Sequence, residues 1–222
     1  MPDRAVVFDL WNTLAVWPDD LSRDFRRRWS SRIGRTIEEI DAAWYAPGAY
    51  ERRESGPIAL ALSNVHDALG VESTDVDELI GWRVEVARAA VVPDDGVVET
   101  LLELRSRGIR VGLISNCTEE VALVWAESLF APLFDVAVLS ATAGCMKPDP
   151  RIYEQACTEL DVAPGDCLFV GDGANDELRG ASDVGMTPVL IHREGQDPYW
   201  ENLRDWDGLR ITSIPQVLDL VP

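Results

Sequence analysis

Three aspartates follow short apolar runs of the kind that form buried parallel strands. Asp9 ends the run at residues 5–9, and Asp172 and Asp176 come just after the run at residues 167–171. A carboxylate can attack an electrophilic phosphorus or carbon and give a covalent intermediate that water then clears. If the three carboxylates converge, they cannot all ionise unless cations offset their charge. We therefore expect Mg²⁺, which prefers oxygen ligands, beside them. A helix cap would explain one of the two later aspartates without a metal.

A single lysine supports this interpretation. The chain has 20 Lys and Arg residues, and Lys147 is the only lysine among them. It lies in a polar segment, residues 146–150, downstream of another apolar run. A compact ammonium group with three donors fits where a broad guanidinium group would not. Two further polar segments, residues 11–13 and 115–116, also follow apolar runs. Four strand ends are thus expected to present polar side chains.

Short apolar runs alternate with helix-like segments through the second half of the chain. The predicted strands are residues 5–9, 110–114, 136–139, 167–171 and 188–191. The predicted helices are residues 94–107, 118–129, 150–160 and 175–184. This alternation predicts an α/β fold, a Rossmann-like doubly wound parallel sheet. Ligands of such sheets bind at the carboxyl ends of the strands, where the polar segments lie.

Residues 15–90 interrupt the alternation and look all-helical. Thr36-x-x-Glu39 is a capping box that starts one helix, and residues 74–90 look like another. We expect a core domain of residues 1–14 and 91–222, with a helical cap domain of residues 15–90 above the strand ends. A second cap signal, at residues 213–216, predicts a short helix near the end of the chain.

The four polar segments, in this order and with a helical insert after the first strand, resemble the haloacid dehalogenase (HAD) superfamily with a helical cap of the C1 type. The resemblance implies that Asp9 is the nucleophile and that Lys147 neutralises it and the transferred group. Three more catalytic side chains would hold the nucleophile or substrate oxygens: Thr13, Ser115 and Asn116. The implied Mg²⁺ ligands are Asp9, Asp172, Asp176 and the main-chain carbonyl of Trp11.

The first segment departs from the phosphatases of this superfamily at two positions. Trp11 stands where they have a second Asp that acts as general acid and base, and Asn12 stands where they usually have Gly. Such acid–base help is typically worth about 10²–10⁴-fold in rate. The 2-haloacid dehalogenases carry an aromatic residue at this position, because a departing halide needs no proton. We take Trp11, Asn12 and a cap arginine, Arg28, as candidate substrate contacts.

Three functions stay open. The first is a Mg²⁺-dependent phosphatase that acts on a small phosphorylated metabolite through an aspartyl-phosphate. The second is a metal-independent 2-haloacid dehalogenase that forms an aspartyl ester. The third is a catalytically impaired binding or regulatory protein. The fourth segment favours the phosphatase, because the dehalogenases bind no metal and carry Ser or Asn in place of Gly171-Asp172. Without a metal, Asp172 would be an uncompensated charge near Asp9.

Composition limits the partners. The chain of 222 residues has a formal net charge of −19, which would repel nucleic acid and anionic membranes. We expect a small anionic substrate, attracted locally by Mg²⁺, Lys147 and cap arginines, and the sequence allows a homodimer. The four cysteines form no C-x-x-C pair, so reduced thiols are expected. With no signal peptide visible at the N-terminus, we expect a cytoplasmic protein.

Overall fold

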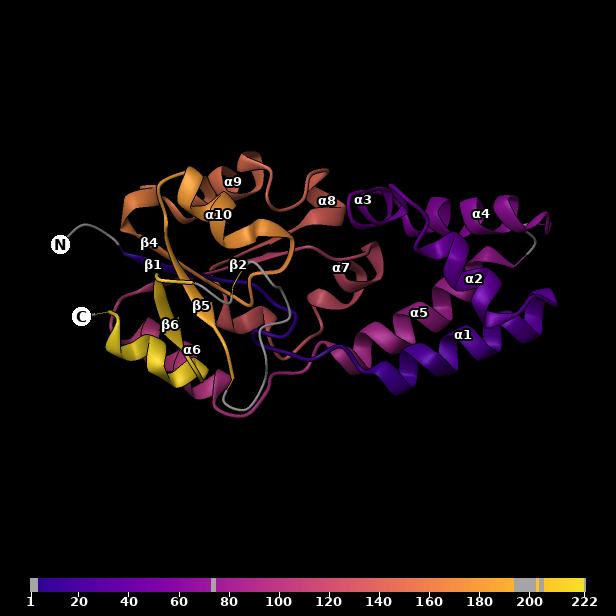
Figure 1. Cartoon of the computed structure of the whole chain (residues 1–222). Coiled ribbons are helices and arrows are strands. Elements are labelled where there is room, and N and C mark those ends of the chain that lie inside the picture. Colours follow the sequence, from indigo (N-terminus) through magenta and orange to yellow (C-terminus); the bar gives the residue numbers. More distant parts are fainter. Residues whose placement is uncertain (1–3, 73–74, 194–202, 204–205, 222) are drawn as a thin grey trace.

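The computed structural model describes residues 4–72, 75–193, 203 and 206–221 of the chain. Its centre is one parallel sheet of six strands in the order β3-β2-β1-β4-β5-β6 (Figure 1). The strands are β1 (Ala5–Phe8), β2 (Arg110–Ser115), β3 (Val136–Leu139), β4 (Cys167–Gly171), β5 (Thr187–Ile191) and β6 (Leu209–Ile211). The strand order reverses beside β1, which makes the carboxyl ends of β1 and β4 the expected ligand site. The α/β prediction is confirmed.

Five of the six strands lie where the sequence predicts them, and β6 was missed. β6 has three residues, of which Leu209 and Arg210 are exposed and only Ile211 is buried. A central parallel strand is buried on both faces and reads as an apolar run, whereas this edge strand does not. It pairs with β5 alone.

Helices cover both faces of the sheet (Figure 1). In β1, Val6 and Phe8 pack with the apolar cluster on one face, whereas Ala5 and Val7 pack with the cluster on the other. The first face carries α6 (Val97–Ser106), α7 (Glu119–Trp125) and the 3₁₀-helix η5 (Ile214–Asp219). The second face carries α9 (Pro150–Leu160) and α10 (Glu177–Asp183). A side chain fully buried in this way contributes about 1.5–3 kcal/mol.

Four predicted helices differ in extent from those observed. The helix predicted over residues 94–107 begins at Val97, after the left-handed Gly96. The helix predicted over residues 118–129 ends at Trp125, whose ring stacks on Phe130 with centroids 5.9 Å apart as the chain turns back. α10 begins at Glu177 rather than residue 175, because Asn175 and Asp176 are left-handed, with φ of 53° and 55°. The segment after Ser213 forms a 3₁₀-helix without the expected side-chain cap.

Among the described residues, five helices lie between β1 and α6, and we refer to them as the cap. They are α1 (Asp19–Ile33), α2 (Ile37–Trp44), α3 (Ala49–Glu54), α4 (Ile58–Leu69) and α5 (Val76–Ala90). They bury an apolar cluster of their own, with Trp29 and Leu62 at its centre. The predicted capping box of α2 is confirmed: Glu39 N donates to Thr36 Oγ1 at 3.2 Å, and Thr36 N donates to Glu39 Oε2 at 2.8 Å.

The cap lies beyond the carboxyl ends of β1 and β2 (Figure 1). The two chain connections into it run together, because Asp94 N donates to Leu14 O at 2.9 Å. α5 packs on α7, where Arg83 Nε of the cap donates to the fully buried Glu120 Oε1 at 2.7 Å. Among the described residues, no helix is both long and apolar enough to cross a membrane.

Candidate active site

Pairing of β1 with β4 brings the first and fourth polar segments together. Phe8 lies opposite Val170, and Asp9 N donates to Val170 O at 2.8 Å. Asp9 and Asp172 therefore leave two adjacent parallel strands at the same edge of the sheet. Both side chains are buried, with exposed fractions of 5% and 7%. The sheet accounts for the convergence that the sequence predicted for these two residues.

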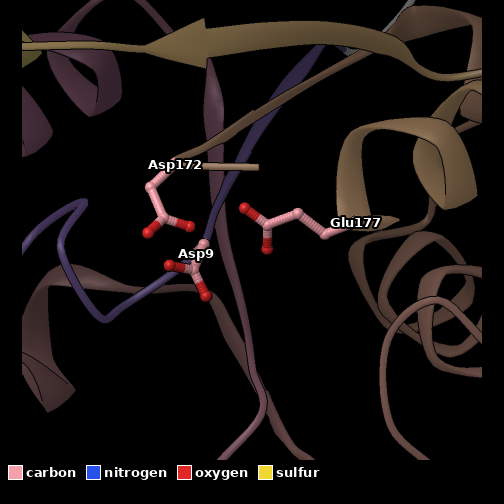
Figure 2. A group of neighbouring side chains, drawn as sticks. All are labelled: Asp9, Asp172 and Glu177. Atoms are coloured by element: carbon pink, nitrogen blue, oxygen red, sulfur yellow. The ribbon is translucent and has the colours of Figure 1, made fainter. Parts of the chain in front are cut away.

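A third carboxylate completes the group. Figure 2 shows Glu177, the first residue of α10, pointing toward Asp9 and Asp172. Each of the three offers an oxygen, and these oxygens all lie within 4.8 Å of one another. We call these three residues the carboxylate cluster. Asp176, the ligand that the sequence reasoning chose, is exposed and is not one of the residues that the structure brings together there.

Lys147 lies inside the carboxylate cluster. Its side chain is 2% exposed, and Nζ donates to Asp9 Oδ1 and, at 2.6 Å, to Glu177 Oε2. Burial alone would lower the pKa of this lysine, but the charges of Asp9 and Glu177 outweigh burial and hold the pKa above its ordinary value. The lysine is therefore a fixed positive charge at Asp9.

Asn116 holds the main chain of Lys147 in place. Its Nδ2 donates to Lys147 O at 3.0 Å, and its Oδ1 accepts from Lys147 N at 2.8 Å. Both of these atoms are thus used in positioning the lysine. Asn116 follows β2 and is itself buried. The sequence predicts a catalytic donor at Asn116, and in the structure this side chain fixes the main chain of Lys147 beside Asp9.

The carboxylate cluster carries more negative charge than Lys147 can offset. Burial, followed by repulsion from Asp9, raises the pKa of Asp172. Burial also raises the pKa of Glu177 to about 8, although Lys147 acts in the opposite direction. Three ionised carboxylates and one ammonium would leave two negative charges in a buried space, which is costly without another cation.

Backbone conformation explains how the residues reach these positions. Asn12 has a φ of 58°, a left-handed conformation that Asn tolerates better than most residues with a side chain. This explains why Asn can stand where glycine is usual, and its Nδ2 lies 3.3 Å from Asp172 Oδ2. Gly171 leaves room for Glu177, because a Cβ at Gly171 would lie 2.1 Å from Glu177 Oε1. Gly173 N donates to the same oxygen at 2.9 Å.

Two predicted hydroxyls are buried near the strand ends. Thr13 Oγ1 has no hydrogen-bond partner among the described residues, although the residue is fully buried. Ser115, at the end of β2, donates weakly from Oγ to Asn116 O at 3.4 Å, and its side chain also hydrogen-bonds to the Cys117 thiol. Buried hydroxyls normally have a partner. An oxygen-rich ligand would supply one to Thr13.

Among the described residues, no hydrogen bond, ion pair or ring contact joins the side chain of Trp11 or Arg28 to the carboxylate cluster. The ring of Trp11 is half-buried and meets Trp17 edge to face, with centroids 4.9 Å apart. Arg28, expected to bind substrate, is instead on an outer face of the cap, where it lies 4.2 Å from the Trp82 ring centroid and pairs with Glu85 at 2.9 Å. The cap arginines that line a cavity beside Trp11 are Arg26, Arg53 and Arg83.

Sequence reasoning missed Glu177 and these three cavity arginines as a set. The fourth polar segment could have pointed to Glu177 as a site residue, because this second acidic residue directly follows Asp176 and lies six residues after Gly171. Helical periodicity cannot identify its direction, since two left-handed residues precede it. The cavity arginines come from α1, α3 and α5, and only the packing of the cap selects them.

The donor set fits Mg²⁺. Asp9 and Asp172 offer carboxylate oxygens at a common point, and the cluster contains neither the His nor the Cys ligands that favour zinc. The excess negative charge and the unpartnered Thr13 hydroxyl agree with a cation and an oxygen-rich ligand at this point. Bound there, Mg²⁺ would supply positive charge and polarise a substrate oxygen.

Comparison with known proteins places this site in a family. The model of the haloacid dehalogenase-like hydrolases matches residues 4–185. The chain is 34% identical to Phosphatase MT3486 of Mycobacterium tuberculosis, over 99% of this chain and 98% of the relative. It is 30% identical to (S)-2-haloacid dehalogenase 4A of Burkholderia cepacia, over 89% of this chain and 87% of the relative.

Solved structures share the fold. The crystal structure of 2-haloacid dehalogenase from Pseudomonas syringae pv. Tomato DC3000 superposes with a TM-score of 0.72 at 20% identity, covering 98% of this chain and 97% of that one. At this identity, the likeness concerns the fold alone. The match of the family model, the two relatives and the parallel sheet with its buried Asp9 and Lys147 agree with one another: the chain belongs to the haloacid dehalogenase-like hydrolase family.

Proposed function

We propose that this hydrolase is a Mg²⁺-dependent phosphatase that acts on a small phosphate ester through an aspartyl-phosphate on Asp9. The carboxylate cluster is the observation that carries the proposal. A metal-independent reaction would leave Asp172 buried beside Asp9 with only hydrogen bonds from Asn12 and Ala174 and the shared charge of Lys147 to offset its own charge. The 34% identity to a full-length relative named a phosphatase supports the same assignment.

The reaction has two balanced steps. An oxygen of the Asp9 carboxylate attacks phosphorus, and the bond from phosphorus to the leaving oxygen breaks with its electron pair on that oxygen. Water then attacks phosphorus and the bond to Asp9 breaks. One proton of the water stays on the released phosphate, and the other passes through solvent to the leaving oxygen. Asp9 returns as a carboxylate.

The chain's own residues each have a part in these steps. Lys147, held by Asn116, pairs with Asp9 and faces the charge that builds on the phosphoryl oxygens. Thr13 has a free hydroxyl for one of those oxygens. Mg²⁺ held by Asp9, Asp172 and the Trp11 carbonyl would neutralise the same group. Glu177 sets the position of Lys147 through its ion pair.

A 2-haloacid dehalogenase is the second candidate, and Trp11 is the observation that favours it. There Asp9 would attack the carbon that bears the halogen, and the halide would depart without a proton. The relative from Burkholderia cepacia carries that name. Four cap arginines were candidates to bind the halide: Arg26, Arg27, Arg28 and Arg32. Arg28 lies on the outer face with Glu85, whereas Arg26 lines the cavity beside Trp11 and keeps this chemistry open.

One assay separates the two candidates. The purified protein is given p-nitrophenyl phosphate or 2-chloropropionate, each with Mg²⁺ or with EDTA, and released phosphate and chloride are measured. We expect phosphate release that EDTA abolishes and Mg²⁺ restores. Chloride release that EDTA does not affect, with no phosphate release, would establish the dehalogenase. Neither product, together with no Mg²⁺ binding by calorimetry, would indicate a binding or regulatory protein.

A further inference from the structure

A cavity of about 220 Å³ lies between the cap and the core. The core contributes Trp11, two residues from the nucleophile, and Asn116, which holds Lys147. The cap covers it from α1, α2 and α3, and Asn175 Nδ2 of the core donates to Tyr50 Oη of α3 at 3.0 Å. We call this space the cap cavity. Its position beside Trp11 makes it the space for the part of the substrate that leaves.

Aromatic rings dominate the wall of the cap cavity. They come from the core and from the cap, and they include Trp11, Trp17, Trp44, Tyr45 and Tyr50. Trp11 and Trp17 meet edge to face. The Cζ of Arg53 lies 4.6–5.7 Å from the ring centroids of Trp44, Tyr45 and Tyr50. Such a wall contacts a flat unsaturated group over a larger apolar area than a flexible polar chain would offer.

The charges in this wall are paired with one another. Arg26 Nε lies 3.7 Å from Asp41 Oδ1, and Arg53 Nε lies 3.3 Å from Glu54 Oε1. Arg83 is bound to Glu120, as described above. Burial raises the pKa of Glu54 to about 7, and Arg53 acts in the opposite direction. Above pH 7, Glu54 is therefore ionised and its negative charge offsets the positive charge of Arg53. A leaving group with a carboxylate or a second phosphate would therefore find no unpaired arginine among the described lining residues.

The residue beside the nucleophile cannot donate a proton. Trp11 stands two residues after Asp9, and an indole N–H is not a general acid at neutral pH. Burial raises the pKa of Tyr50 to about 12, so this phenol keeps its proton. The other carboxyl groups of the wall, Asp41 and Glu54, face arginines. Glu54 loses its proton above its pKa of about 7, so at pH 8 the leaving oxygen must depart largely as an anion.

An aromatic hydroxyl suits both features of the cap cavity: it can leave without a proton donor, and it carries a ring for the aromatic wall. A phenol has a pKa near 10, as in tyrosine, whereas water has a pKa of about 15.7 and simple alcohols are similarly weak acids. A phenolate can thus leave without the general acid that an alkoxide needs. Its ring also matches the aromatic, charge-balanced wall.

We propose that the substrate is the phosphate monoester of a phenol or of a similarly acidic hydroxyl on an uncharged planar ring, with the ring in the cap cavity. The proposal rests on the proposed phosphatase function. Asp9 bonds to phosphorus, the bond from phosphorus to the aryl oxygen breaks, and the electron pair leaves on the phenolate, which takes a proton from water after release.

The test is a series of substituted phenyl phosphates of increasing phenol pKa together with a short alkyl phosphate, assayed with Mg²⁺ at pH 8. We expect kcat/KM to fall steeply as the phenol pKa rises, with the alkyl ester slower by about 100-fold or more. Trp11→Asp should raise kcat/KM of the alkyl ester at least about 10-fold, and it should lower kcat/KM of the nitrophenyl ester, which loses a ring contact.

Cap variants test where the ring lies. Tyr45 lines the cavity and is 59% exposed, so Tyr45→Ala is expected to fold. It should raise KM for aryl esters several-fold without changing KM for the alkyl ester, and Trp44→Leu should act in the same direction. Trp82→Ala is the matched control, because Trp82 is a cap tryptophan of the outer pocket beside Arg28.

The outcomes separate this proposal from the function on which it rests. Equal kcat/KM for alkyl and aryl esters would overturn the aryl assignment but not the phosphatase function. The same conclusion would follow if Tyr45→Ala and Trp44→Leu changed KM equally for both kinds of ester. No phosphate release from any ester would overturn both. A steep dependence on phenol pKa that Trp11→Asp flattens would support it.

Discussion

In the core, three buried carboxylates share a single lysine, whereas in the cap cavity each arginine faces a carboxylate. The first region is short of positive charge and the second is balanced. The excess negative charge of the core region suits a site that binds a cation and an anionic group together. The balance suits a site that recognises shape. Trp11 belongs to both regions, because it follows the nucleophile in sequence and lines the cap cavity.

The largest expected effect is in the core. Asp9→Asn removes the nucleophile and should lower kcat by about 10⁴-fold or more, as loss of a nucleophile does in other covalent mechanisms. Steady-state kinetics with a nitrophenyl phosphate would measure the loss. Asp183→Asn, an exposed carboxylate on α10 with Arg179 as its neighbour, is the control and should keep kcat within about twofold. An Asp9→Asn variant with unchanged kcat would refute the covalent scheme.

Lys147→Arg should have the next largest effect. The Nζ of Lys147 is enclosed by Asp9 and Glu177, and a planar guanidinium needs more room than this buried site has. We expect kcat to fall about 10²-fold or more while the protein stays folded, as checked by circular dichroism. Retention of full activity would mean that any cation suffices, and that the single lysine of this chain has no special role.

Breaking one balanced pair of the cap region should mainly affect stability. Arg83→Met leaves Glu120 as a fully buried charge and should lower the free energy of unfolding by about 3–5 kcal/mol. Adding Glu120→Leu should recover much of that loss. Urea denaturation of the two single variants and the double variant measures the coupling. Additive losses would show that the two residues do not stabilise the closed cap as a pair.

A pH effect should follow from Glu54. Its pKa is about 7 in the folded protein against an ordinary value of 4.5, because burial disfavours the charged form. Between these values the folded state binds more protons than the unfolded state, so the free energy of unfolding falls as pH rises from 4.5 to 7. Relative to wild type, Glu54→Gln should therefore gain stability on going from pH 4.5 to pH 8, by about 3 kcal/mol at most. Denaturation curves of both proteins at the two pH values measure this. The same difference in free energy of unfolding between variant and wild type at both pH values would contradict the prediction.

The smallest expected effect distinguishes two neighbouring acids. Asp176 is exposed, whereas Glu177 belongs to the carboxylate cluster. Asp176→Asn should change kcat and the Mg²⁺ affinity by only a few-fold, and Glu177→Gln should lower kcat considerably more. Calorimetric titration with Mg²⁺ and steady-state kinetics on both variants would decide. A larger loss for Asp176→Asn would restore the ligand set expected from sequence.

The sequence predicts the strands whose residues are continuously buried. It does not predict which side chains face the site where tertiary packing decides their direction. Apolar runs identify β1 and β4, and the adjacency of these strands is what brings Asp9 and Asp172 together. β6 was missed because it is short and half-exposed. Glu177 depends on two left-handed residues and on the space at Gly171. Arg28 and Arg83 are alike as residue types, and only the closed cap separates the outer face from the cavity.

Trapping of the phosphoenzyme tests the central claim most directly. The protein is mixed with a nitrophenyl phosphate and Mg²⁺, quenched in acid within one turnover, and its intact mass is measured. The account predicts a mass gain of one phosphoryl group, located on the peptide that contains Asp9, lost with EDTA and absent in Asp9→Asn. Phosphate release without this adduct at any quench time, or an adduct that persists in Asp9→Asn, would contradict it.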